Sequence, residues 1–312
     1  SVVKQFREMK VSQKAAVESG LILKREHKDG YYDRFRNRIM FPIFDVNMQV
    51  AGFGGRVMDD SMPKYMNSPE TPVYNKGRIL YGLHASKQHC RREGELFIVE
   101  GYFDFLSLFQ HGIKNAVASL GTALTPDHVR ILKGYASKII LVFDSDAAGI
   151  KAAERSIALF NKEGVDTRVL VLPEGHDPDS FVVEHGRDAF LELASGARTV
   201  MQFLLKVATD AHGLSVEGRA RILDDMKDPV SRIQDSALRS LYVRELSETL
   251  NINEAAVLEK VREHKHTRSM PETGPAGVSG TADEPERLAS DPREEQMISL
   301  MLNCPSILDQ VR

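Results

Sequence analysis

Between residues 95 and 171 the sequence alternates regularly between short apolar runs and amphipathic segments, and this alternation restricts the chain to few folds. The runs LFIV, NAVAS, KIILVF and TRVLVL are typical of strands, while FDFLSLFQHG and TPDHVRILKGY have helical spacing. Strands that alternate with helices predict an α/β fold in which a parallel sheet is flanked by helices. Sites in such sheets lie at the carboxyl ends of the strands, so functional residues are expected there.

Acidic residues occur at these strand ends in three clusters. One follows LFIV, one follows KIILVF and one follows TRVLVL. Because parallel strands end at the same edge of a sheet, we expect the carboxylates to project into one crevice. A single Asp-x-Asp pair fits a helix cap or a turn equally well, but three clusters at corresponding positions favour a shared site. The six residues are Glu100, Asp104, Asp144, Asp146, Asp177 and Asp179.

Carboxylates gathered without basic partners repel one another, and a bound hard cation relieves that repulsion. Mg²⁺ prefers oxygen ligands and keeps several waters, which suits phosphoryl transfer on nucleotide phosphates. The clusters therefore predict a site for Mg²⁺ or Mn²⁺. Asp127, which follows Pro126, is a contrasting case that we expect to cap a helix only.

The charge of the chain is divided unevenly along the sequence. Residues 1–92 hold 17 Lys and Arg against 9 Asp and Glu, a balance of +8, whereas residues 93–312 hold 24 against 35, a balance of −11. A basic segment beside an acidic one suggests a polyanion held by the first and a cation by the second, although two solvated faces would give the same counts. Tyr65, Tyr74 and Tyr81 lie among the basic residues, where they could line a stacking groove or pack into a local core.

Composition divides the chain into five segments. Residues 1–94 predict a basic, mixed α/β subdomain, and residues 95–190 contain the parallel sheet. Apolar residues at helical spacing predict a helical bundle over residues 191–264. Residues 265–290 are rich in Pro, Gly, Ser and Thr, which predicts a flexible linker. Helical spacing resumes in residues 291–312, which we expect to begin a further helical domain.

Cysteine usage and hydropathy exclude several classes of protein. Cys90 and Cys304 lie far apart and outside any C-x-x-C spacing, which supports neither a disulfide framework nor a zinc module. His84 and His89 lie close to Cys90 in the sequence, and we interpret all three as ordinary surface residues. The apolar runs are too short to span a bilayer and no signal segment opens the sequence, so we expect a cytosolic protein without membrane contact.

The motifs around the acidic residues resemble a known domain. E-G-Y-x-D, A-S-L-G-T, F-D-x-D-x-A-G and D-P-D follow one another as in the Toprim domain shared by bacterial primases, topoisomerases and some nucleases. Upstream, RFRNRIMFPIFD, GFGGRV, PKYMNSPET and KGRILYGL resemble the basic subdomain of bacterial DnaG-type primases, which other Toprim families lack. Residues 30–190 carry this resemblance most closely. The chain is thus similar to the RNA polymerase core of the DnaG-type primases.

This resemblance implies a DNA-dependent RNA polymerase that makes short RNA primers on single-stranded DNA from ribonucleoside triphosphates, in the cytoplasm at the bacterial replisome. Glu100 matches the family's metal-binding or acid–base glutamate, and Asp144 and Asp146 match its metal-binding aspartates. Asp104, Asp177 and Asp179 match further acidic positions around the Mg²⁺ or Mn²⁺. The residues expected to contact nucleic acid or nucleotide are Arg34, Arg36, Arg38, Arg56, Lys64, Lys76 and Arg78.

Members of this family have two further domains, and two alternative functions are open for the chain. The sequence holds no N-terminal cysteine-rich module, so we expect no zinc in this fragment. Residues 291–312 resemble only the first helix of the domain that contacts the replicative helicase. A Toprim-type nuclease or topoisomerase is one alternative, and a non-catalytic DNA-binding adaptor is another. A topoisomerase would need a further domain with a nucleophilic tyrosine, and an adaptor would not need all six carboxylates.

Overall fold

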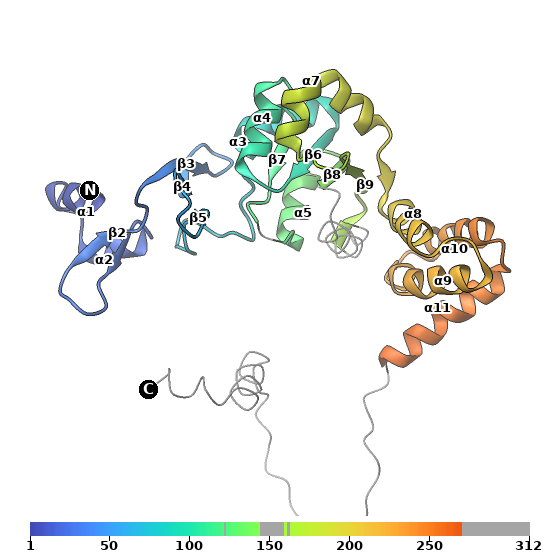
Figure 1. The fold of residues 1–312 in the computed structure, drawn as a ribbon. Helices are drawn as coiled ribbons and strands as arrows, with labels where there is room; N and C mark the ends of the chain where they lie inside the picture. Colours follow the sequence, from blue (N-terminus) through green and yellow to red (C-terminus); the bar gives the residue numbers. More distant parts are fainter. Residues whose placement is uncertain (122, 144–158, 161–162, 270–312) are drawn as a thin grey trace, which may run out of the picture. The chain divides into compact units, whose positions relative to one another are not determined.

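The computed structural model describes residues 1–121, 123–143, 159–160 and 163–269 (Figure 1). Asp144 and Asp146 lie outside the described residues. So do residues 291–312 and most of the predicted linker, whose first five residues are the end of a helix rather than irregular chain.

A five-stranded sheet forms the centre of the middle region. The strand order is β7-β6-β8-β9-β10, with four neighbouring parallel strands and the antiparallel strand β10 at one edge. The parallel strands are the four predicted apolar runs, so the predicted α/β fold is confirmed. The strands are β6 (Glu95–Val99), β7 (Ala116–Ala118), β8 (Lys138–Phe143), β9 (Asp166–Val171) and β10 (Arg198–Thr199). The flanking helices are α3 (Leu83–Glu93), α4 (Tyr102–Gln110), α5 (Pro126–Lys133) and α7 (Pro178–Ser195).

Alternate residues of these strands enter two separate cores, because successive side chains of a strand point to opposite faces. Ile98 and Leu141 belong to one core, whereas Phe97 and Ile140 belong to the other. The first core includes side chains of α3 and α5, and the second includes side chains of α4 and α7. Burial on both faces explains why the strands are continuous apolar runs rather than alternating patterns.

The chain ahead of this sheet holds two short helices and two small antiparallel sheets, as predicted for a mixed α/β region. The basic run and the glycine-rich hairpin form β3 and β4, paired from Arg38 opposite Val57 to Phe44 opposite Val50. A third strand, β5, pairs with the other edge of β4. The elements are α1 (Val2–Glu8), α2 (Gln13–Glu18), β1 (Ile22–Lys24), β2 (Tyr31–Asp33), β3 (Arg38–Phe44), β4 (Val50–Val57) and β5 (Tyr65–Asn67).

Aromatic side chains join the three-stranded sheet to α4. The ring of Phe41 on β3 stacks on the ring of Tyr102, with centroids 5.0 Å apart, and Tyr81 meets Tyr102 edge-on at 4.8 Å. Each such pair stabilises by about 0.5–1.5 kcal/mol beyond the burial of its area. All three rings are buried in the same core as β6 and β8, so the small sheet and the larger sheet share one apolar interior.

The residues after the larger sheet are helical, as their apolar spacing predicted. Three of the helices begin at a side-chain cap, in which Thr199, Ser215 or Asp235 accepts a backbone N–H of the first turn. The buried faces of these helices continue the core that contains Ile98. Among the described residues, no helix is long and apolar enough to cross a membrane. The helices are α8 (Val200–His212), α9 (Val216–Ser231), α10 (Ser236–Leu250) and α11 (Glu254–Ser269).

A substitution at Gly54 on β4 tests the contact between the three-stranded sheet and Tyr102 of α4. A Cβ at this position would lie 2.1 Å from the Tyr102 hydroxyl oxygen, so the ring or the strand would have to move. We expect Gly54→Ala to lower the free energy of unfolding by about 1–3 kcal/mol, the usual cost of overpacking a core. Urea denaturation measures this, with Gly77→Ala as the control because a Cβ there meets only side-chain atoms, at 3.2 Å or more. Wild-type stability in Gly54→Ala would contradict the packing.

Candidate active site

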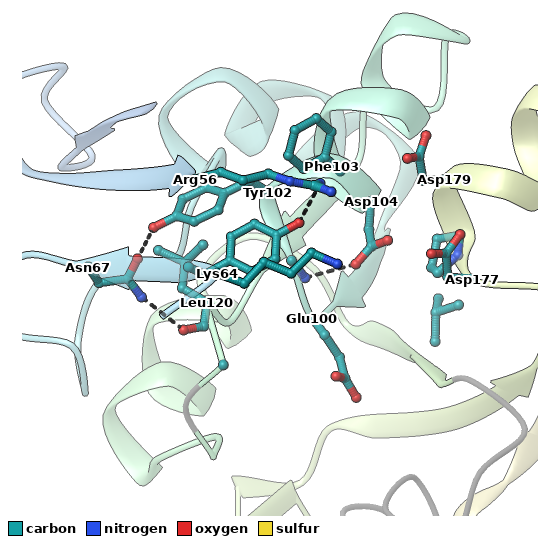
Figure 2. Close-up of a pocket in the computed structure, with 15 residues that line it drawn as sticks. Arg56, Lys64, Asn67, Glu100, Tyr102, Phe103, Asp104, Leu120, Asp177 and Asp179 are labelled. Carbon is teal, nitrogen blue, oxygen red and sulfur yellow. Dashed lines mark hydrogen bonds between the residues drawn. The ribbon is translucent and has the colours of Figure 1, made fainter. Parts of the chain in front are cut away.

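A cavity of about 490 Å³ lies where the ends of the parallel strands meet β4 and β5 (Figure 2). Figure 2 shows Arg56 and Lys64 entering it from one side and Asp177 and Asp179 from the other. The cavity therefore lies at the carboxyl ends of the parallel strands, where the sequence predicts a site. Its lining residues are Arg56, Lys64, Tyr65, Asn67, Glu100, Gly101, Tyr102, Phe103, Asp104, Leu120, Gly121, Val142, Asp177, Pro178 and Asp179.

Four of the six predicted carboxylates line this cavity. Glu100 directly follows β6 and is exposed to solvent. Asp104 lies in the first turn of α4, where its carboxylate accepts the backbone N–H of Gly101 at 2.8 Å. A negative charge is favourable at a helix N-terminus, so the helix dipole of α4 stabilises Asp104 in addition to this hydrogen bond. Acids that the sequence placed after separate strands are thus brought together.

Asp177 is the N-cap of α7. Its Oδ1 accepts the backbone N–H of Ser180 at 2.7 Å and the Ser180 hydroxyl at 2.6 Å. Capping and metal binding were alternatives for this residue, and the cap is formed; a carboxylate retains a second oxygen and further lone pairs for other partners. Asp179 lies in the first turn of the same helix. The start of α7 therefore holds both carboxylates at the cavity.

Asp144 and Asp146 follow Phe143, the last residue of β8, and lie outside the described residues. The strand itself lies between β6 and β9, and Val142 lines the cavity. The metal-binding role of the two aspartates stays a prediction.

A cation–aromatic cluster forms the opposite wall of the cavity. The guanidinium of Arg56 lies 4.6 Å from the ring centre of Phe103 and 5.1 Å from that of Tyr65, and it also donates to the Tyr65 hydroxyl at 2.6 Å. Contacts over two ring faces hold the guanidinium in place at the cavity wall. Tyr65 remains 42% exposed, so part of its side chain is accessible to a ligand.

Asn67 links three parts of the chain beneath this wall. Its side-chain oxygen accepts the hydroxyl of Tyr102, and its side-chain nitrogen donates to the carbonyl of Leu120 at 3.2 Å. Leu120 is buried and has a φ of +61°, a left-handed conformation that is uncommon for leucine. Neither Asn67 nor Leu120 is predicted from the sequence to have a role in the site. Both lie in motifs that carried the family resemblance, but neither bears a charge that would have indicated chemistry.

Solved structures with this architecture are known. A crystal structure of a DNA primase domain from Pseudomonas aeruginosa is 38% identical to the chain, with a TM-score of 0.72, and the match covers 80% of this chain and 79% of that one. The chain belongs to the bacterial DnaG-type primase family. The Escherichia coli primase catalytic core is similar as well, at 36% identity and a TM-score of 0.71, over 81% of this chain and 82% of that one.

Sequence comparisons agree with this family assignment. The DNA primase of Clostridium acetobutylicum is 39% identical over 246 residues, which cover 78% of this chain and 41% of the relative. The chain thus spans about two-fifths of the length of the curated relatives it matches. Family models match the DNA primase catalytic core N-terminal domain at residues 1–87, a Toprim-like domain at residues 97–182, and the DnaB-helicase binding domain of primase at residues 201–255.

The match to the DnaB-helicase binding domain, at residues 201–255, runs from α8 into the start of α11. The sequence instead predicts that the helicase-contacting segment begins at residue 291, which lies outside the described residues. The expected boundary at residue 191 falls inside α7, whereas the boundary at residues 94 and 95 coincides with the start of β6.

The predicted basic residues are distributed over several environments. Only Arg56 and Lys64 line the cavity. Arg38 donates to the carbonyl of Pro63 at 2.8 Å and, more weakly, to that of Lys64 at 3.4 Å, so its guanidinium supports the loop that carries Lys64. The remaining residues lie elsewhere: Arg36 over the ring of Tyr32, Arg34 with a buried Nε, Lys76 after the bridged turn at Thr71–Tyr74, and Arg78 near the carboxylate of Asp127.

The structure decides between the two alternatives for the tyrosines and corrects two smaller expectations. Tyr74 and Tyr81 pack into the core, at 2% and 7% exposure, whereas Tyr65 is exposed. Cys90 is not a surface residue: it is fully buried on α3, and burial raises the pKa of its thiol to about 12. Asp127 does lie in the first turn of α5, but the cap is Thr125, whose hydroxyl accepts the backbone N–H of the third helical residue.

The donor groups of the cavity suit a hard cation. Toprim-type enzymes generally use a divalent metal ion, and the acids that line this cavity offer oxygen ligands only. Arg56 and Lys64 on the opposite side provide positive charge for phosphate groups. This combination of carboxylates and cations around one hollow can hold a metal-bound polyphosphate.

The pKa of the Tyr65 phenol depends on the charges around this cavity. Burial raises its pKa, the guanidinium of Arg56 lowers it, and the carboxylates of Asp104, Asp179 and Asp177 raise it further. These effects place the acids and Arg56 within electrostatic range of one hydroxyl group.

We therefore expect the pKa of Tyr65 to fall in Asp179→Asn, because a negative charge that disfavours the phenolate is removed. The pKa should rise in Arg56→Ala, because a stabilising positive charge is lost. NMR titration of ¹³C-labelled tyrosine measures both shifts, and Asp188→Asn, a 97% exposed carboxylate on α7, is the control. An unchanged Tyr65 pKa in both variants would contradict the arrangement of the cavity.

Proposed function

We propose that this chain catalyses the DNA-templated synthesis of short RNA primers by metal-dependent nucleotidyl transfer. The observation that carries the proposal is the cavity in which carboxylates from separate strand ends face Arg56 and Lys64. Its relatives named as DNA primases support the same reaction. A DnaG primase catalytic domain has been solved bound to single-stranded DNA, which supports a single-stranded template.

Mg²⁺ or Mn²⁺ would be held by Glu100, Asp104, Asp177 and Asp179, together with Asp144 and Asp146. The ion would neutralise the triphosphate and lower the barrier to attack by the primer 3′-hydroxyl on the α-phosphate, with pyrophosphate as the leaving group. Glu100, exposed at the strand end, could also act as an acid–base group.

The residues on the opposite wall would bind the polyanions. Arg56 is oriented by its contacts with Tyr65 and Phe103, so its guanidinium is already positioned for phosphate oxygens of the ribonucleoside triphosphate. Lys64 stands on the loop that Arg38 supports and is itself exposed. The exposed part of the Tyr65 side chain offers a surface for a base of the template or nucleotide. Template, primer and nucleotide would thus share the basic wall.

The partners follow from the same family. We infer that α8, α9 and α10, where the DnaB-helicase binding domain matches, contact the replicative helicase. The alternative segment, residues 291–312, stays a prediction. The working location would be the bacterial replisome in the cytoplasm, because the relatives are replication primases.

The test separates chemistry from template binding with two variants. Glu100→Gln removes one negative charge at nearly constant size, so we expect primer synthesis to fall by at least about 100-fold, the usual effect of losing one electrostatic group of an active site. Its affinity for single-stranded DNA should persist, because repulsion of phosphates decreases. Lys64→Ala should bind the DNA more weakly, with a salt dependence shallower by about 0.7 in log–log slope. At saturating DNA, its synthesis rate should suffer less.

Primer synthesis is measured with ribonucleotides, Mg²⁺ and a single-stranded template, alongside DNA titrations at two salt concentrations. Lys206→Ala is the matched control, because Lys206 pairs with Asp210 on α8 and does not line the cavity. Loss of DNA binding in Glu100→Gln with unchanged binding in Lys64→Ala would overturn the assignment. Template cleavage without synthesis by the wild type would instead favour a Toprim-type nuclease.

A further inference from the structure

A second group of metal-ligating side chains lies beside the acidic cavity. His176 in the loop after β9, and Glu184 and His185 on α7, each bring one ligand atom within 4.8 Å of the others. None of the three lines the acidic cavity. The group therefore differs from the carboxylate cluster in both position and chemistry, since it offers two imidazoles and one carboxylate.

The imidazole of His176 is held in a fixed place with part of its bonding capacity unused. Its ring packs edge-on against His185, with centroids 5.2 Å apart, and against Phe181 at 5.7 Å. The Nδ1 atom is buried and has no hydrogen-bond partner among the described residues. A buried ring nitrogen without a partner requires an explanation, and an ion or a water bound to the ring is one.

The other two side chains leave the site open to solvent. Glu184 and His185 are 64% and 40% exposed, and their Oε1 and Nε2 atoms lie 3.8 Å apart. An ordinary surface ion pair would account for these two residues but not for His176. Gly186, with a φ of +81°, interrupts the helix directly after His185, so the two ligands end the first segment of α7.

We propose that His176, Glu184 and His185 form a binding site for a borderline transition-metal ion of the Zn²⁺ class. Imidazole nitrogens select such ions over Mg²⁺, whereas a carboxylate accepts either. Ligands of a tetrahedral zinc lie about 3.4 Å from one another, given Zn–N and Zn–O distances of about 2.1 Å. The two exposed side chains can close the remaining gap by rotamer changes, and a water would complete the coordination.

Occupancy of this site would connect the loop after β9 to the first segment of α7. Asp177 and Asp179, two carboxylates of the cavity, lie between the ligands in the sequence. An ion at the histidines would therefore restrain the segment that carries these aspartates. The site is defined by the positions of His176, Glu184 and His185, and it does not depend on whether the chain synthesises primers.

The test is a titration with Co²⁺, followed by visible absorption, in untagged protein with excess Mg²⁺ to occupy the carboxylates. Co²⁺ bound in a tetrahedral site with nitrogen ligands absorbs far more strongly than Co²⁺ in octahedral oxygen sites. We expect wild type to develop this band with saturation at one ion per chain, and Zn²⁺ to displace it. His185→Ala and Glu184→Ala should each weaken binding by at least about tenfold, because even outer-sphere changes cost that much. Both residues are exposed, so the fold should be preserved.

Two controls define the outcome. His27→Ala removes a histidine that is 93% exposed in the N-terminal region and should leave the band unchanged. Glu100→Gln should also retain the band, because the carboxylate cluster is a different site. The proposal is overturned if wild type shows no strong band, or if His185→Ala and Glu184→Ala bind Co²⁺ as tightly as wild type.

Discussion

The stacking of Phe41 on Tyr102 connects the three-stranded sheet to α4, which directly follows β6 and the acidic end of that strand. Tyr102 continues the connection through its hydroxyl, which donates to Asn67, and Asn67 in turn holds the carbonyl of Leu120. Burial raises the pKa of Tyr102 well above its ordinary value, so the hydroxyl stays protonated and remains a donor at any physiological pH. Arg56 of β4 and Lys64, which directly precedes β5, thereby lie opposite the carboxylates at the ends of the parallel strands.

Local capping places the carboxylates with little dependence on one another. Asp104 bonds to the backbone of Gly101, and Asp177 bonds to Ser180 at the start of α7. Because the chain itself holds Asp104 and Asp177 in place, repulsion between these two acids cannot simply drive them apart. A bound divalent cation would reduce this repulsion further than Arg56 and Lys64 can from the opposite wall, so the preformed arrangement suits metal-dependent chemistry.

Sequence periodicity predicted the parallel strands and the positions of Glu100, Asp177 and Asp179, because each depends on residues within one strand or one turn. It did not predict the role of Arg38, whose guanidinium bonds to carbonyl groups of a loop more than twenty residues away. The burial of Tyr74 likewise depends on a tertiary contact, since its ring packs against Gly52 of β4. Charge and spacing indicate where chemistry can occur, whereas neutral residues that hold the site together leave no comparable signal in one sequence.

The central claim is that the basic sheet and the acidic strand ends form one site. Paramagnetic broadening by Mn²⁺ tests this claim most directly, because it depends steeply on distance from the bound ion. With sub-stoichiometric Mn²⁺, the backbone N–H of Gly101 and the side-chain amide of Asn67 should both broaden, while the side-chain amide of Asn251, at the end of α10 and outside the cavity, stays sharp. Broadening of Gly101 with a sharp Asn67 signal would show that the basic sheet does not share the metal site.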